Sequence, residues 1–163
     1  MSDNVTLNHI DEIYDKYADM LYRIALTHLK SKTDAEDAVH DTFYRYITKH
    51  KHFNDEEHLK AWLIKVLVNI CYDMLRKNKN IHSLNDIDIE DIQSDENIEN
   101  EKYQEILAVL EKLEAKYKTV VILYYLEELS IEEIATSLKL SKSAIKMRLS
   151  RARQMIAAEV TNK

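Results

Sequence analysis

The fold is decided by the stretch SIEEIATSLKLSKSAIKMRLSRAR, residues 130–153. Its first residue, Ser130, is followed three residues later by Glu133, and this capping-box spacing predicts a helix over 131–138. Lys139 and Leu140 follow this helix, and the next residue, Ser141, predicts the start of a second helix over about 142–160. Two helices joined by so short a turn are typical of a helix-turn-helix.

Apolar residues of this stretch lie where the two predicted helices would meet. Ala135 is small at the point of closest approach, which suits helices that cross at a steep angle. The residues expected to face inward are Ile134, Ala135, Leu138, Leu140, Ile145 and Leu149.

The outward face of the second helix is polar and basic. Residues 141–153 contain five bases and no acid, and long donors on one side of a helix suit the major groove of DNA. Arg151 and Arg153 are better placed for phosphates than for base edges. An ordinary amphipathic helix with a solvated basic face is the alternative. The candidate DNA-binding residues are Lys142, Ser143, Lys146, Met147, Arg148, Ser150, Arg151 and Arg153.

The composition favours an all-α fold. The 163-residue chain contains no glycine and no proline, so nothing in it breaks long helices. In the N-terminal half, apolar residues recur at spacings of three and four over about 9–29, 33–50 and 55–77. Thr33, followed three residues later by Glu36, predicts a capping box at the start of the second of these helices.

Two helical regions are separated by an acidic segment. Residues 84–101 hold eight acids and no base, which favours a flexible linker. Further helices are expected over about 101–114 and 115–127. The prediction is two small helical domains, over 1–78 and 102–163, joined by a flexible acidic linker over 79–101.

Several classes of function are disfavoured. The seven histidines and the single cysteine, Cys71, form no metal-ligand pattern and no internal disulfide. A chain without glycine has no phosphate-binding loop, and no nucleophile motif occurs. We therefore expect no enzymatic activity, metal, cofactor or small-molecule substrate. No apolar stretch reaches the roughly 20 residues of a membrane span, so a cytoplasmic protein without direct membrane insertion is expected.

Two blocks of the chain resemble extracytoplasmic-function (ECF) sigma factors. DAEDAVHDTFYRY, followed by LKAWLIKVLVNICYDMLRK, is similar to the N-terminal domain of that family. LEAKYKTVVILYYLEELSIEEIATSLKLSKSAIKMRLSRARQMI is similar to its promoter-reading C-terminal domain. The resemblance implies a transcription initiation factor that binds core RNA polymerase, at the clamp coiled coil of the largest subunit and at the flap. It further implies recognition of the minus-10 and minus-35 elements of promoter DNA.

The resemblance also implies which residues of the N-terminal domain bind polymerase. Acids at Asp34, Asp37 and Asp41 share one helical face, although a solvated acidic stripe would look the same. The implied polymerase-binding residues are Asp34, Asp37, Asp41, Phe43 and Arg45.

In the family, the loop at 51–59 receives a base flipped out of the minus-10 element, and the next helix holds the opened strand. Trp62 could stack on a base, but it also lies on the apolar stripe and could belong to the core. Asp73 could hold Lys65, Asn69 or Arg76 in place. The implied minus-10 residues are Lys51, His52, Phe53, Asn54, Lys60, Trp62, Lys65, Asn69, Arg76 and Lys77.

The resemblance leaves alternatives open. Lys139 stands where the family usually has glycine, so the turn would be slightly reshaped, at about 1 kcal/mol for a left-handed residue. The family usually has an anti-sigma partner, often membrane-bound, which would hold the protein near the membrane. The rivals are a helix-turn-helix regulator without a polymerase role, a sigma-like protein that does not initiate alone, and a protein-interaction module.

Overall fold

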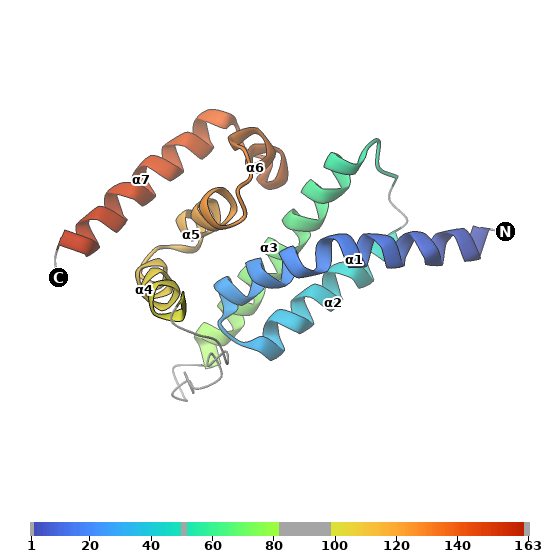
Figure 1. The fold of residues 1–163 in the computed structure, drawn as a ribbon, viewed down its shortest axis with the longest axis horizontal. Coiled ribbons are helices and arrows are strands. Elements are labelled where there is room, and N and C mark those ends of the chain that lie inside the picture. The colour runs from blue at the N-terminus through green and yellow to red at the C-terminus, as the bar shows by residue number, and fades with distance from the viewer. Residues whose placement is uncertain (1, 50–51, 82–98, 162–163) are drawn as a thin grey trace. The chain divides into compact units, whose positions relative to one another are not determined.

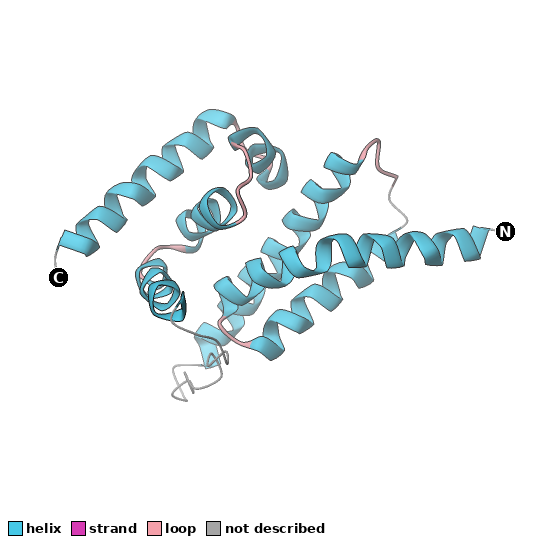
Figure 2. Cartoon of the chain, viewed as in Figure 1, coloured by secondary structure: helices cyan, strands magenta, loops and turns pink. Residues whose placement is uncertain are grey.

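The computed structural model describes residues 2–49, 52–81 and 99–161 (Figure 1). All regular structure in these ranges is helical, and Figure 2 shows the helices joined by short loops. The all-α prediction is therefore confirmed. The chain divides into two compact units, residues 1–86 (unit 1) and 87–163 (unit 2). None of the described helices is long and apolar enough to cross a membrane.

Unit 1 is built from three helices: α1 (Ser2–Leu29), α2 (Lys32–Lys49) and α3 (Glu56–Ile81). Each contacts the other two, so one core lies between them. Its most deeply buried large side chains come from α1 and α3, while α2 contributes smaller residues and one phenylalanine. The buried apolar set includes Leu21, Ile24, Leu63, Ile64, Leu67, Ala35, Ala38, Val39 and Phe43.

The starts of α2 and α3 are capped by side chains. The Ser31 hydroxyl accepts a hydrogen bond from the Asp34 backbone N–H at 3.2 Å, so Ser31 caps α2 and the capping box predicted at Thr33 is wrong. The reason is that Lys30, at φ 57°, turns the chain directly after α1, so that the next helix already begins at Lys32. The Asp55 carboxylate accepts from the His58 N–H at 2.8 Å and caps α3.

Unit 2 consists of four short segments and one long helix: α4 (Glu99–Glu111), α5 (Ala115–Val121), η2 (Ile122–Leu126), α6 (Ile131–Leu138) and the long α7 (Lys142–Thr161). The helix predicted over 115–127 is present, but its second half, η2, is a π-helical turn. Helix α7 packs against α4, α5 and α6. The fully buried large side chains of this unit are Leu110, Ile122, Leu123, Ile134, Ile145 and Leu149.

Helices enter the segment predicted as a linker from both sides. Helix α3 continues to Ile81, four residues beyond its expected end, and α4 begins at Glu99, two residues before its expected start. Residues 82–98 lie outside the described residues, so the flexible linker and the domain limits stay predictions.

Candidate functional site

The helix-turn-helix predicted from residues 130–153 is present in unit 2. The Ser130 hydroxyl accepts from the Glu133 N–H at 3.0 Å, and the Glu133 carboxylate accepts from the Ser130 N–H at 3.2 Å. Lys139 takes the left-handed conformation, φ 55° and ψ 47°, and the Leu140 N–H donates to the Ala135 carbonyl at 3.0 Å. The capping box is therefore confirmed. Lys139 adopts its left-handed conformation despite the cost for a residue other than glycine.

The inward and outward faces of the motif also agree with the prediction. Ile134, Ile145 and Leu149 are fully buried, whereas Leu138 and Leu140 are half-buried. The Ser141 hydroxyl accepts from the Ala144 N–H at 3.1 Å and starts α7. All predicted DNA-binding residues on α7 are exposed except Arg148, which is half-buried: Lys142, Ser143, Lys146, Met147, Ser150, Arg151 and Arg153.

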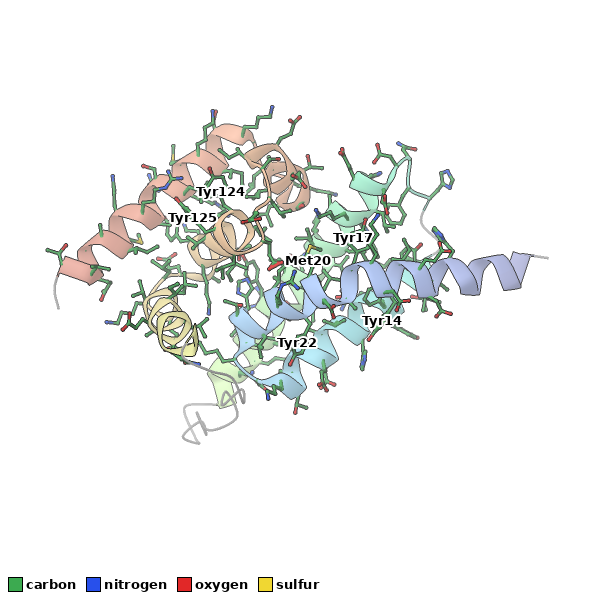
Figure 3. All side chains as sticks on the ribbon, in the orientation of Figure 1. Tyr14, Tyr17, Met20, Tyr22, Tyr124 and Tyr125 are labelled. Atoms are coloured by element: carbon green, nitrogen blue, oxygen red, sulfur yellow. The ribbon has the colours of Figure 1, made fainter. Side chains whose placement is uncertain are left out.

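One of these residues, Arg153, has neighbours that the sequence did not indicate. Its Nε donates to the Tyr125 hydroxyl at 2.6 Å, and its guanidinium lies over the rings of Tyr124 and Tyr125. Figure 3 shows both tyrosines between the α5–η2 segment and α7. The adjacent tyrosines are a visible sequence feature, but their contact with α7 is seen only in the structure, where the π turn η2 carries them.

The acidic stripe predicted to bind polymerase lies along α2. Asp37 is exposed, and Asp34 and Asp41 are half-buried. Asp41 accepts from Arg45 at 3.3 Å, which holds a positive group at the end of the stripe. The Asn78 amide donates to Asp34 at 3.5 Å, so the start of α2 is tied to the end of α3.

Two aromatic residues of α2 differ from the prediction. Phe43, expected on the polymerase-binding surface, is only 5% exposed, with its ring centroid 4.9 Å from that of Tyr14. It supports the acidic stripe from beneath because it belongs to the apolar face of the helix. Tyr44 was missed: it is 66% exposed and follows Asp37 by seven positions and Asp41 by three, so it lies on the same face.

The loop before α3 and the start of that helix form an aromatic cluster. Phe53 stacks on Tyr46, with ring centroids 6.1 Å apart, and meets Trp62 edge-on at 5.4 Å. Trp62 is half-buried in this cluster, so its side chain is neither sealed in the core nor fully exposed for stacking on a base. His52 and Asn54 are exposed beside it, and Lys51 lies outside the described residues.

A pocket of about 560 Å³ opens next to this cluster. It is bounded by α1, the end of α2, the loop and the first turn of α3, so four elements contribute walls. Its surface is mixed: aromatic and aliphatic side chains alternate with two histidines and two carboxylates. The residues around it are His9, Ile10, Ile13, Tyr46, Ile47, His52, Phe53, Asp55, Glu56 and Leu59.

A polar network fixes the pocket wall formed by the start of α3. Glu56 forms an ion pair with Lys16 of α1, and this contact lowers the pKa of its carboxyl. Burial, followed by the Glu56 charge and a hydrogen bond to it, raises the pKa of Tyr17 to about 12. Tyr17 therefore stays protonated and keeps its hydrogen bond throughout the physiological range.

The polar side chains predicted on α3 lie along its accessible side. Asn69, Arg76 and Lys77 are exposed, whereas Lys60 and Lys65 are half-buried. Arg76 forms an ion pair with Asp73, one of the three partners considered for that acid. No group of three or more potential metal ligands occurs among the described residues, and Cys71 is buried.

Both units match known protein families. Residues 13–81 match the model of sigma-70 region 2, and residues 103–156 match that of sigma-70 region 4. The chain is 36% identical over 155 residues to ECF RNA polymerase sigma factor SigM of Bacillus subtilis, covering 91% of this chain and 93% of SigM. The chain belongs to the ECF family of sigma-70 factors. It is also 31% identical over 140 residues to RNA polymerase sigma factor SigV of Bacillus subtilis, covering 86% and 84% of the two chains.

Two solved structures share the fold of this ECF sigma factor. CnrH, in complex with the cytosolic domain of CnrY, has a TM-score of 0.74 and 21% identity, and the match covers 96% of this chain and 90% of CnrH. RpoE of Bartonella quintana, in complex with the anti-sigma factor NepR, has a TM-score of 0.71 and 24% identity, with 93% and 96% covered. The family fixes the function: this ECF sigma factor is a transcription initiation factor that directs RNA polymerase to promoters.

Proposed function

We propose that the two units divide promoter recognition between them. Unit 1 binds the clamp coiled coil of the largest polymerase subunit and holds the opened minus-10 strand. Unit 2 lies at the flap and reads the minus-35 duplex. The observation that carries the proposal is α7, whose buried side is locked into a capped helix-turn-helix while its basic side stays exposed.

The polymerase-binding surface is the α2 stripe of Asp34, Asp37 and Asp41, with Arg45 at its end. Carboxylates that share one helical face, with Asp37 exposed at their centre, attract a basic partner and set the orientation of docking. Tyr44 adds a large, exposed apolar group to this stripe, and tyrosine is enriched among residues that dominate binding energies. Phe43 acts indirectly, by fixing the helix that carries these side chains.

The minus-10 site combines the pocket of unit 1 with the polar side of α3. A pocket of about 560 Å³ with the rings of Tyr46 and Phe53 in its wall suits an unstacked base, because rings stack on the faces of any base. Exposed Asn69, Arg76 and Lys77 then follow the strand as polar readers and phosphate contacts. Lys60 and Lys65, which are half-buried, would contact the strand with the ends of their side chains.

Regulation by an anti-sigma factor is the third part of the proposal. RpoE of Bartonella quintana, which has the same fold, forms a complex with the anti-sigma factor NepR. A partner of this kind would cover the exposed faces of α2, α3 and α7. The protein itself would act in the cytoplasm, held near the membrane where such a partner is membrane-bound, and would catalyse no reaction and need no cofactor.

Two measurements test the proposal together. The purified chain is mixed with core RNA polymerase, and complex formation is monitored by size-exclusion chromatography. Run-off transcription is then measured on fragments recovered by genome-wide binding. We expect a stable complex and promoter-dependent transcripts. Complex formation without transcripts would identify a sigma-like regulator that does not initiate alone, and binding to DNA without polymerase would identify a helix-turn-helix regulator.

A further inference from the structure

The contact between η2 and α7 holds the side chain of one surface arginine, Arg153, in a fixed orientation. The Nε of Arg153 donates to the Tyr125 hydroxyl at 2.6 Å. The guanidinium carbon also lies 5.9 Å from the ring centroid of Tyr124 and 5.7 Å from that of Tyr125. The two rings meet edge-on, with centroids 4.9 Å apart, so they form two walls around the cation.

This arrangement leaves hydrogen-bond donors available to a ligand. Tyr125 is 48% exposed, and Arg153 is exposed as well. A guanidinium has five N–H donors, and the bond to Tyr125 uses only the one on Nε, which leaves the four on the two Nη atoms. The Tyr125 hydroxyl accepts from Arg153 and keeps its own proton, which it can donate. The pair therefore presents several donors and a positive charge, the requirements for an oxyanion.

The position of the pair identifies the oxyanion. Arg153 continues the exposed row of α7 that begins at Lys142 and Lys146, at spacings of four and seven along the helix. A DNA duplex that lies against this row presents phosphodiester oxygens along both edges of its major groove. The tyrosines come from another element, η2, and so extend the DNA-facing surface beyond α7 itself.

We propose that Tyr125 and Arg153 form a phosphate clip, a paired site that binds one phosphodiester group of the DNA backbone beside the helix-turn-helix. The clip deepens the minus-35 function proposed for unit 2 and rests on it. Tyr125 is a direct phosphate ligand and also positions Arg153, whereas Tyr124 contributes only its ring. Because the guanidinium is already oriented, little side-chain entropy is lost when the phosphate binds.

The test uses the full chain and a short DNA duplex without promoter sequence, because phosphate contacts do not depend on sequence. The Arg153 Nε–Hε signal is monitored by NMR at low salt as the duplex is added. We expect this signal to shift for the unchanged protein. Tyr125→Phe should weaken the binding about fivefold, the loss of one hydrogen bond to a charged group at an exposed site. Arg153→Lys, which keeps the charge but lacks Nε, should show a similar loss of affinity, measured on neighbouring α7 amides.

Tyr124→Phe is the matched control, since it also removes a tyrosine hydroxyl but keeps the ring beside Arg153. It should bind as the unchanged protein does. An unshifted Arg153 signal, or equal or tighter binding by Tyr125→Phe, would overturn the clip; tighter binding would mean that Tyr125 restrains Arg153. A failure of the minus-35 function would appear elsewhere, as polymerase complexes that form normally but ignore promoter sequence.

Discussion

Unit 1 and unit 2 present their binding residues in different ways. Unit 1 consists of helices of 28, 18 and 26 residues, and its candidate surfaces run along the sides of α2 and α3. Unit 2 has helical segments of 13, 7, 5 and 8 residues before α7, and its candidate surface is set by a capping box, a left-handed lysine and a π turn. Helical periodicity alone therefore places the residues along α2 and α3 of unit 1, whereas in unit 2 caps and turns orient α7, the helix that carries the candidate residues.

The largest expected effect tests whether the two units are separate cores. Leu63 is 0% exposed in unit 1, so Leu63→Ala should lower the free energy of unfolding of that unit by about 3 kcal/mol. Amide hydrogen exchange should then show faster opening of α1 to α3 and unchanged protection of α5 to α7. Leu149→Ala, at 1% exposed, is the counterpart in unit 2 and should give the reverse pattern. Loss of protection in both units from either change would show that they unfold together.

The next effect separates DNA binding from polymerase binding. Lys146→Glu puts a carboxylate on the exposed face of α7. We expect promoter affinity to fall by about 2 kcal/mol, roughly 30-fold, because a hydrogen-bond donor is replaced by a negative group that the DNA phosphates repel. Affinity for core polymerase should not change. Fluorescence anisotropy of the holoenzyme on a promoter fragment measures the loss. Lys116→Glu, an equal charge change at an exposed residue of α5, should have little effect.

The complementary change is on α2. Asp37→Lys reverses an exposed acid in the middle of the predicted polymerase-binding stripe, and the affinity for core polymerase should fall about tenfold. Competition against a labelled sigma factor gives the affinity. Asp15→Lys makes the same charge change at an exposed residue of α1 and is expected to bind normally. Equal losses for both variants would mean that net charge, not the α2 stripe, determines binding.

The smallest effect concerns a feature that both units share. Lys30 and Lys139 are left-handed, with φ 57° and 55°, and each directly follows a helix. Glycine relieves about 1 kcal/mol of strain but has more conformational freedom when unfolded, so Lys30→Gly and Lys139→Gly should each stabilise their unit by about 0.5 kcal/mol. Chemical denaturation measures both changes. Lys30→Ala and Lys139→Ala keep a side chain at the strained position and should give no gain; a gain as large from alanine would refute the explanation.

Local features were the ones that the sequence predicted well. The capping box at Ser130 and the cap of α7 at Ser141 depend on residues within a short distance of each other along the chain, and both are found as expected. The start of α2 was misplaced by the same kind of reasoning. Ser31 and Thr33 both offer a hydroxyl to a helix start, and the choice between them depends on the turn at Lys30, which the pattern around Thr33 does not contain.

The features that the sequence missed depend on packing between elements. The helical spacing of α2 itself places Phe43 on the apolar face, where it packs against Tyr14, and its assignment to a binding surface came from the family resemblance alone. The bond between Tyr125 and Arg153 joins residues 28 positions apart, and it depends on the direction in which η2 turns its side chains. No periodicity in the sequence marks a π turn inside a helix.

The π turn has a consequence for chain length in this region. The Glu127 N–H donates to the Ile122 carbonyl five residues earlier, at 3.0 Å, instead of four. The segment thus holds a residue more than regular α-helical bonding would need. Removing one residue would restore that bonding and rotate the downstream residues by about 100° relative to α5. An insertion or deletion here would therefore change the direction of the Tyr124 and Tyr125 side chains together, while α6 and α7 could keep their own internal hydrogen bonds.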